Sequence, residues 1–386
     1  MTTLELEVGA VAHGGHCIAR HEGRAVFVRH ALPGEVVEAA VTEGGEDARF
    51  WRADAVTILQ ESPDRVVSAW PEAGAGGVGG GELAHVALPA QRVWKRDVLR
   101  EAFERFAGVE FWGDVAAAPG DDDRGGLAYR TRVTAVADAQ GRASMKRFRS
   151  AESLTLDSMP LATPEAERLL LGARLEPGTR FTVAVSATGD AAVVGGAQSG
   201  ASVLERIDTE AGPIDYRVRA DGFWQVHREA AQLLVNRVLT LAGDADRVAD
   251  LYAGAGLFGA ALAAQGRSVT LVEFDRRAAQ SATRNVAPWP TARVIPGDVR
   301  RTVASGQLGR VDVVVLDPPR SGAGGATIAA LDALKPRRIV YVACDPVALA
   351  RDVALLNDRG YALQEVEAYD LFPMTHHVEA VAVLSR

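Results

Sequence analysis

The feature that most constrains the fold is the alternation of strand-like and helix-like segments after residue 227. Short runs rich in β-branched residues recur there, and helical patterns separate all but the last two runs, which lie at 247–253, 268–273, 292–298, 311–317, 338–344, 361–369 and 379–385. This alternation is typical of parallel strands joined by helical crossovers. It predicts a doubly wound α/β domain, in which ligands bind outside the carboxyl ends of the strands.

The residues before this domain follow other patterns. Short strand-like segments separated by Gly or Pro fill residues 4–60 and predict a small closed barrel of the oligonucleotide-binding type. A glycine-rich stretch at 71–82 predicts a flexible connector, and alternating segments up to Val226 predict an antiparallel sheet. We therefore expect an α/β protein with a β-barrel at 1–62, a connector at 63–88, a central α+β domain at 89–226 and the α/β domain at 227–386.

Composition places the chain among globular proteins. It has 386 residues, of which 48% are hydrophobic and 24% are charged, and it shows no long apolar stretch. The N-terminus lacks the pattern of a signal peptide, so we expect a cytoplasmic monomer without a membrane partner. Its two cysteines, Cys17 and Cys344, are far apart, which supports neither a disulfide framework nor a cysteine-based metal site.

The distribution of charge is uneven. The formal net charge of −8 argues against a generally basic surface that would coat nucleic acid. One local segment differs, because Asp138 is its single acidic residue among the basic residues Arg130, Arg132, Arg142, Lys146, Arg147 and Arg149. This segment is the basic patch that the sequence predicts.

Cys344 stands where a predicted strand ends and a predicted helix begins. The apolar run 339–342 stops at Cys344, and the helical pattern starts directly after Asp345 and Pro346. Asp345 is a favourable N-cap and Pro346 a favourable first helical residue. The positive end of the helix dipole is then expected to favour the thiolate of Cys344, as in a catalytic nucleophile. The alternative is a small buried apolar residue.

Other strand ends carry chemistry of their own. Gly254 and Gly256 permit a tight turn after the first strand, and Glu273 closes the second strand at the distance where an acid can bind ribose hydroxyls. This order fits an adenosine-bearing cofactor, either a dinucleotide or S-adenosylmethionine. Asp317 opens a rigid Asp-Pro-Pro-Arg corner that could hold a carboxylate over a planar ring, although an ordinary turn is the alternative. The last strand starts at Glu379, near the same edge.

The motifs DLYAGAGLF, DPPR, ACDP and DLFPMTHHVE, preceded by Phe-Trp-Gln, resemble those of the RNA uracil-C5 methyltransferases that use S-adenosylmethionine. They span residues 223–379 in the family's order and spacing. The N-terminal barrel resembles the TRAM domain, which the ribosomal-RNA members carry and the transfer-RNA members generally lack. The resemblance therefore covers nearly the whole chain and implies an enzyme with a Rossmann-like methyltransferase domain.

The resemblance implies a role for each matching residue. Cys344 matches the nucleophile that adds to C6 of uracil, and Glu379 matches the base that removes the C5 proton after methyl transfer. The residues that match the cofactor site are Gln225, Tyr252, Gly254, Glu273, Asp298 and Asp317. The implied cofactor is S-adenosylmethionine and the implied partner is RNA, with ribosomal RNA favoured and transfer RNA left open.

The sequence departs from the family at one element. Many relatives hold an iron–sulfur cluster with cysteines just after the barrel, whereas this chain has Val-Gly-Gly-Gly at 78–81. Because cluster ligands are cysteines, we expect neither an iron–sulfur cluster nor any other metal. The cofactor loop also carries Ala253 and Leu257, where relatives often have cysteine and asparagine.

Three other functions were weighed. A nicotinamide or flavin dehydrogenase would leave Cys344 and the Asp-Pro-Pro-Arg corner without a purpose. A methyltransferase acting on exocyclic amines would have an aromatic residue in place of Arg320. A non-catalytic RNA-binding or assembly factor would have no need of both Cys344 and Glu379, and a methyl-transfer assay separates it from an enzyme.

Overall fold

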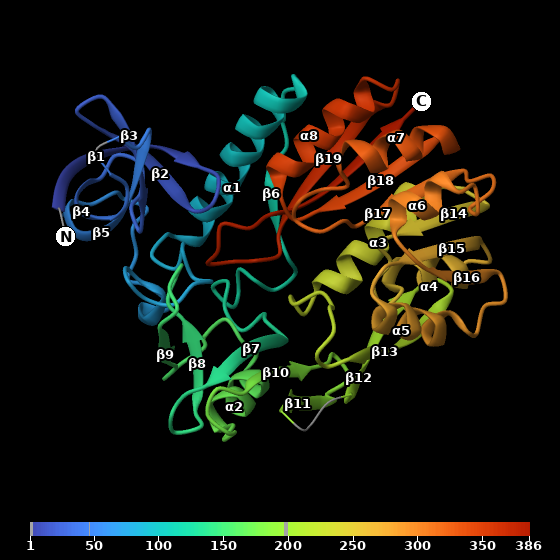
Figure 1. Ribbon diagram of the computed structural model, residues 1–386, viewed down its shortest axis with the longest axis horizontal. Coiled ribbons are helices and arrows are strands. Elements are labelled where there is room, and N and C mark those ends of the chain that lie inside the picture. Colours follow the sequence, from blue (N-terminus) through green and yellow to red (C-terminus); the bar gives the residue numbers. More distant parts are fainter. Residues whose placement is uncertain (1–2, 46, 197–199) are drawn as a thin grey trace.

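The computed structural model describes residues 3–45, 47–196 and 200–386. Its N-terminal part is the closed barrel that the sequence predicts, with strands β1 (Thr3–Ala12), β2 (His16–His21), β3 (Arg24–Arg29), β4 (Val36–Glu43) and β5 (Phe50–Gln60). Alternate residues of these strands point inward, so that Leu6, Val26 and Val37 form the barrel core. The barrel lies at one end of the molecule (Figure 1).

The glycine-rich connector is not the flexible segment that we expected. It contains a short helical turn, η1 (Pro71–Ala73), and buries Trp70 completely and Val78 almost completely. The carboxylate of Glu72 ties it to the central domain, because it accepts hydrogen bonds from the backbone N–H of Asp157 at 2.9 Å and from the hydroxyl of Ser158 at 2.6 Å. The buried side chains of Trp70 and Val78, together with the hydrogen bonds of the Glu72 carboxylate, thus offset the flexibility of the glycines.

Helix α1 (Leu88–Ala102), which continues into the π-helical turn η2 (Phe103–Ala107), lies between the barrel and the C-terminal domain (Figure 1). Trp94 and Val98 pack into the barrel core. Leu99 and Phe103 pack into the core of the C-terminal sheet. One helix therefore joins two hydrophobic cores.

The central part is the antiparallel sheet that the sequence predicts. Its strand order is β11-β10-β7-β8-β9, and helix α2 packs on it. The elements are β7 (Arg132–Ala137), β8 (Ala143–Lys146), β9 (Ser153–Thr155), α2 (Pro164–Gly172), β10 (Arg180–Val185) and β11 (Ala191–Gly195). A hairpin of β12 (Ser202–Thr209) and β13 (Gly212–Arg219) follows and packs through Tyr216 against the C-terminal domain.

The C-terminal domain is the predicted doubly wound sheet. Its strand order is β16-β15-β14-β17-β18-β20-β19-β6, with β16 to β18 parallel and β20 antiparallel to β18. Strand β6 (Val115–Ala117), which lies before the central sheet in the sequence, completes its edge beside β19.

The domain's other strands are β14 (Arg247–Leu251), β15 (Ser268–Glu273), β16 (Ala292–Pro296), β17 (Val313–Leu316), β18 (Arg338–Ala343), β19 (Ala362–Asp370) and β20 (Glu379–Ser385). Its helices are α3 (Ala230–Ala242), α4 (Leu257–Ala264), α5 (Arg276–Val286), α6 (Val299–Ala304), α7 (Gly324–Leu334) and α8 (Pro346–Asn357). Helices α3 to α5 cover one face of the sheet and α6 to α8 cover the other. Within the described residues, no helix is both long enough and apolar enough to cross a membrane.

Candidate active site

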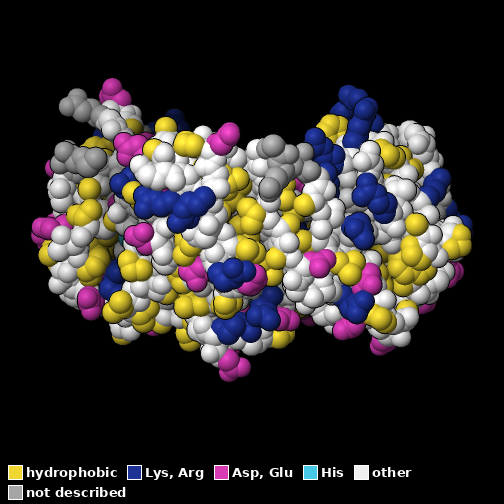
Figure 2. Space-filling view, turned by 90° about the horizontal axis from the view of Figure 1, so that it is seen from below, with side chains coloured by type: hydrophobic (Ala, Val, Ile, Leu, Met, Phe, Trp, Pro, Cys, Tyr) yellow, Lys and Arg dark blue, Asp and Glu magenta, His cyan; other side chains and the backbone are white. Residues whose placement is uncertain are grey.

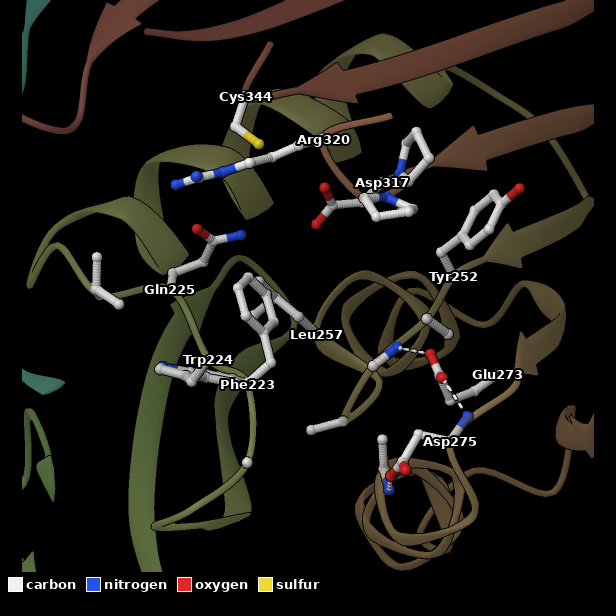
Figure 3. A pocket seen from close by; sticks show the side chains of 18 of the residues that line it. Phe223, Trp224, Gln225, Tyr252, Leu257, Glu273, Asp275, Asp317, Arg320 and Cys344 are labelled. Atoms are coloured by element: carbon white, nitrogen blue, oxygen red, sulfur yellow. Dashed lines mark hydrogen bonds between the residues drawn. The ribbon is translucent and has the colours of Figure 1, made fainter. Parts of the chain in front are cut away.

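A cavity of about 1130 Å³ opens at the carboxyl edge of the C-terminal sheet. The sheet's strand ends form one wall, and the segment 218–226 after β13 forms the opposite wall. All the site residues that the sequence analysis singled out line this one cavity: Gln225, Tyr252, Gly254, Glu273, Asp298, Asp317, Cys344 and Glu379. Residues up to 154 positions apart in the chain, from Gln225 to Glu379, therefore meet in one place (Figure 3).

The turn after β14 and the acid at the end of β15 form a rigid unit. Gly254 has a φ of +56°, a left-handed conformation that glycine adopts without strain. Glu273 accepts hydrogen bonds from the backbone N–H of Gly254 at 2.8 Å and of Asp275 at 2.7 Å, which Figure 3 shows as dashed lines. The orientation of the Glu273 carboxylate is thus fixed before a ligand arrives. An acid held beside a glycine turn at this edge fits a bound ribose.

Two other predicted cofactor residues have structural partners of their own. The Tyr252 hydroxyl lies 3.5 Å from that of Thr327 and faces away from the centre of the cavity (Figure 3). Asp298 caps helix α6, because its carboxylate accepts the backbone N–H of Arg301 at 2.9 Å. Both residues line the cavity, and both also stabilise the elements that carry them.

Asp250 lies beneath the glycine turn and was not predicted as a site residue. One oxygen of its fully buried carboxyl accepts the backbone N–H of Gly259 at 2.8 Å, while the other has no hydrogen-bond partner among the described residues. The pKa of Asp250 is raised to about 8, first by burial and then by the charges of Asp317 and Glu273, although the hydrogen bond from Gly259 opposes the rise. The sequence signal was its place at the start of DLYAGAG, directly before the turn.

Asp317 and Glu379 form the most strongly perturbed pair in the cavity. Burial raises the pKa of Asp317 to about 7. The pKa of Glu379 lies well above its usual value, first because the carboxyl is completely buried and second because Asp317 is close. Two buried carboxyl groups that repel each other hold fewer than two negative charges near neutral pH. One of the two carboxyl groups can therefore hold a proton while the other, when ionised, accepts one.

Cys344 follows β18, and Asp345 caps helix α8 as predicted by accepting the backbone N–H of Ala348 at 2.8 Å. The expectation that this position favours the thiolate is wrong. Burial, then the charges of Glu379 and Asp317, raise the pKa of the Cys344 thiol to about 12. Cys344 lies outside the first turn of α8, and the nearby carboxyl groups outweigh the helix dipole. The thiol is therefore the resting form.

Arg320 and His377 form a hydrogen-bonded pair beside the cysteine, in which Arg320 carries the positive charge. The guanidinium of Arg320 donates a hydrogen bond to Nε2 of His377 at 3.0 Å. The pKa of His377 is lowered to about 3, first by burial and then by the neighbouring His376 and Arg320, so its ring is neutral and can accept this bond. Figure 3 shows Arg320 extended alongside Cys344. Both residues belong to motifs of the sequence, Asp-Pro-Pro-Arg and the stretch 370–379, but no local pattern indicates that they contact each other.

The segment 370–379, which leads to Glu379, is anchored from the other domains. The fully buried ammonium of Lys95 on α1 contacts the carboxylate of Asp370 and donates to the carbonyl of Phe372 at 3.0 Å. Tyr129 donates to the carbonyl of Pro373 at 3.1 Å. These contacts hold the approach to the proposed base, and no local pattern in the sequence indicated them.

The barrel also reaches the site directly. Nε2 of His13, in the loop between β1 and β2, lies 3.0 Å from Oδ2 of Asp345, the residue after Cys344. This contact helps to lower the pKa of Asp345 despite its burial. The barrel is thus docked against the helix that begins beside the cysteine.

The residues after the barrel do not fit an iron–sulfur cluster. The whole sequence contains only Cys17 and Cys344, and the described residues include no group of three or more His, Cys, Asp or Glu that could hold a metal ion. At Gly81, within the 78–81 segment, an added Cβ would lie 2.6 Å from the side chain of Ala73. Even a small side chain at this position would collide with the packed connector.

Models of known families match the N-terminal and C-terminal parts of the chain. The TRAM domain matches residues 1–56, the methyltransferase small domain matches residues 224–334, and the tRNA (uracil-5-)-methyltransferase family matches residues 307–386. The first match coincides with the β-barrel and the other two with the sheet that carries the cavity. These matches confirm the resemblance that the motifs indicated.

Relatives match over almost the full length. An uncharacterized RNA methyltransferase of Streptomyces avermitilis is 42% identical over 98% of this chain and 97% of its own length. Another, of Bifidobacterium longum, is 38% identical over 100% of this chain and 97% of its own. The 23S rRNA (uracil(1939)-C(5))-methyltransferase of a Shewanella species is 28% identical over 96% of this chain and 93% of its own.

A solved structure has the same fold. The crystal structure of Pyrococcus abyssi tRNA (uracil-54, C5)-methyltransferase in complex with S-adenosyl-L-homocysteine is 22% identical, with a TM-score of 0.74, over 99% of this chain and 100% of that one. The full-length relatives, the family models and the common fold agree with the glycine turn and the acid that line the cavity. The chain belongs to the S-adenosylmethionine-dependent RNA uracil-C5 methyltransferases.

Proposed function

We propose that this enzyme methylates C5 of a uridine in ribosomal RNA through a covalent bond between Cys344 and C6. The observation that carries the proposal is the meeting of Cys344, Asp317 and Glu379 on one cavity with a glycine turn and a ribose-binding acid. C5 of uracil is too weak a nucleophile to take a methyl group directly, so a residue that adds to C6 is needed. Cys344 is the nucleophile present in this cavity.

The proposed reaction balances in three steps. The thiol of Cys344 loses its proton to water, the thiolate adds to C6, and the electron pair of the C5–C6 double bond forms an enolate between C5 and O4. S-adenosylmethionine, when bound, supplies a methyl group on a sulfonium: as the bond from this methyl group to C5 forms, its bond to sulfur breaks, and S-adenosylhomocysteine is left as a neutral thioether. Glu379 then removes the C5 proton, and the returning electron pair restores the C5–C6 double bond and expels the thiolate. Its raised pKa makes Glu379 a stronger base toward the C5 proton once its own carboxyl is ionised.

The surrounding residues have supporting roles in this proposal. Glu273 binds the ribose of S-adenosylmethionine, Gly254 gives the cofactor room, and Gln225, Tyr252 and Asp298 line its site. Asp317 reaches the cavity close to Glu379 and keeps a proton in the pair. Arg320, which partly offsets the carboxyl charges at Cys344, favours loss of the thiol proton.

Trapping of the covalent intermediate tests the two catalytic assignments separately. Cys344→Ala should abolish methylation and leave cofactor binding intact, because the nucleophile alone is removed. Glu379→Gln should still add to C6 and transfer the methyl group, but it should remain attached to the RNA. On a denaturing gel with labelled RNA this species is a shifted band that requires both Cys344 and S-adenosylmethionine. Normal turnover by Glu379→Gln, or a band in the Cys344→Ala background, would contradict the assignments.

The choice of ribosomal RNA rests on the TRAM barrel and on the relative that acts on 23S rRNA. The second candidate is the same chemistry on transfer RNA, which the name of the matching family model and the solved structure with the same fold favour. Mapping of 5-methyluridine in both RNA classes, from cells with and without the gene, decides between them. Loss of the methyl group from transfer RNA alone would overturn the choice.

A further inference from the structure

Several arginines of the basic patch that the sequence predicts are paired with carboxylates of the protein, one pair buried and two at the surface. The guanidinium of Arg132 is buried against Glu205 at 3.3 Å, and that of Arg142 contacts Asp138 at 3.1 Å. Arg149 contacts Glu43 of the barrel at 2.9 Å. Arginines that already have carboxylate partners have little free charge left for phosphates, so this segment is a weak candidate for the main RNA contact.

Four other arginines lack such partners. Arg276 and Arg277 begin helix α5, and Arg300 and Arg301 lie in the first turn of helix α6. All four are exposed, and across residues 3–45, 47–196 and 200–386 their side chains make no ion pair or hydrogen bond. The positive end of a helix dipole repels cations, so Arg276 and Arg277 oppose the stability of helix α5, whereas Arg301 also falls in the last turn of the six-residue helix α6. Residues that break a local rule without a compensating contact are expected at functional surfaces.

The four arginines lie at the rim of the active site. Helices α5 and α6 pack on opposite faces of the sheet, yet both begin at its carboxyl edge, after β15 and β16. Arg277 and Arg300 line the catalytic cavity, together with Phe274, whose side chain is 73% exposed. Figure 2 shows Lys and Arg side chains gathered over the methyltransferase half of the molecule, at the upper right of the view, where acidic side chains are sparse.

We propose that these four residues, the α5–α6 basic rim, bind the sugar–phosphate backbone of the RNA beside the target nucleotide. The proposal rests on the proposed function and adds one place where the RNA backbone lies: at the edge of the methyltransferase domain where α5 and α6 begin. Guanidinium groups bind phosphates without reading the sequence, so the rim supplies affinity and register. An exposed aromatic residue among cations is typical of surfaces that bind single strands.

The salt dependence of RNA binding tests the rim. The variant Arg276→Glu/Arg301→Glu changes the two members that do not line the cavity, so cofactor binding should be unchanged. The slope of log K against log salt is negative, and each lost phosphate contact reduces its magnitude by roughly 0.7 on a single strand. We expect the magnitude of the slope to fall by about 1.4, and the affinity near 0.1 M salt to fall roughly 25-fold. The probe is an unstructured uridine-rich RNA, and its binding is followed by fluorescence anisotropy.

A matched control separates local contacts from net charge. The variant Arg168→Glu/Arg310→Glu has the same net charge but removes arginines that already contact Glu165 and Asp312, away from the cavity. It should keep the wild-type slope, and Arg276→Lys/Arg301→Lys should keep most of it because the charges remain. Equal slopes for the two glutamate variants, or a wild-type slope for Arg276→Glu/Arg301→Glu, would overturn the proposal.

The methylation assay is read separately from binding. If the slope differs between the wild type and Arg276→Glu/Arg301→Glu as expected, but the wild-type protein adds no methyl group to uridine C5, the proposed function fails and the basic rim stands. If methylation occurs and the slope is unchanged in Arg276→Glu/Arg301→Glu, the rim fails and the proposed function stands.

Discussion

Replacement of Asp250 by asparagine should remove a large part of the protein's pH-dependent loss of stability. The pKa of this buried carboxyl is raised from 3.8 to about 8, so the folded protein keeps a proton that the unfolded chain releases. Its contribution to stability is complete below the unfolded pKa and is lost as the pH rises through the folded pKa. Between these values one such group lowers the free energy of unfolding by about 1.4 kcal/mol per pH unit.

The size of the effect follows from this slope. From about pH 6 to pH 8, Asp250 alone should lower the free energy of unfolding by roughly 2 to 3 kcal/mol, and Asp317, with a pKa of about 7, should add a smaller loss. Asparagine keeps the oxygen that accepts the N–H of Gly259. Its amide nitrogen would lie where the second oxygen of Asp250 has no hydrogen-bond partner among the described residues, and a buried N–H left unpaired there carries a pH-independent cost of about 1 to 3 kcal/mol. The slope is therefore the informative quantity.

Urea unfolding at a series of pH values measures the slope. Wild-type protein should lose stability steadily across neutral pH, and Asp250→Asn should show a clearly flatter profile. The control Asp358→Asn changes an exposed carboxylate after helix α8 and should follow the wild type. If Asp250→Asn and the wild type have parallel profiles, Asp250 is ionised in the folded protein and the reasoning about its burial is wrong.

Three further predictions concern the site and its support. Lys95→Met should lower the free energy of unfolding by about 3 to 5 kcal/mol, because it leaves Asp370 charged, fully buried and without its Lys95 partner. Chemical denaturation measures this loss. A loss below about 1 kcal/mol would show that Asp370 takes up a proton or another partner. Glu273→Ala should weaken S-adenosylmethionine binding roughly tenfold or more through the lost ribose hydrogen bonds, and unchanged affinity in titration calorimetry would remove Glu273 from the cofactor site. The single-turnover rate of methyl transfer should rise with pH across the neutral range. Cys344, with a pKa raised to about 12, must lose a proton, and Glu379 must be ionised to act as a base. A rate that falls with pH would mean that another proton controls the reaction.

The sequence predicted those features that depend on local patterns. The β-barrel and the doubly wound sheet follow from hydrophobic periodicity, and the meeting of Cys344, Asp317 and Glu273 follows because parallel strands end at one edge. The N-cap at Asp345 was predictable for the same reason, since a cap and its helix are neighbours in the chain.

Features that depend on distant partners were missed. Lys95 and Asp370 lie 275 residues apart, and nothing near either residue indicates a buried pair. The glycine-rich connector was expected to be flexible, because its order comes from Glu72 contacts to a segment more than eighty residues away. The pKa of Cys344 was predicted in the wrong direction, since the helix dipole is visible in the sequence and the facing carboxyl groups are not.

The two-sided helix α1 has a consequence for the family's evolution. Its Trp94 and Val98 are buried only because the barrel covers them, whereas Leu99 and Phe103 serve the catalytic core whether or not a barrel is present. A protein of this fold without the barrel would expose an indole and an isopropyl group on a helix that it cannot discard. Loss or gain of the barrel should therefore coincide with a change of these two positions between apolar and polar residues. Excision of residues 1–62 from this chain should yield an aggregating protein, because it would expose Trp94 and Val98 together with Leu83 and Val86 of the same core.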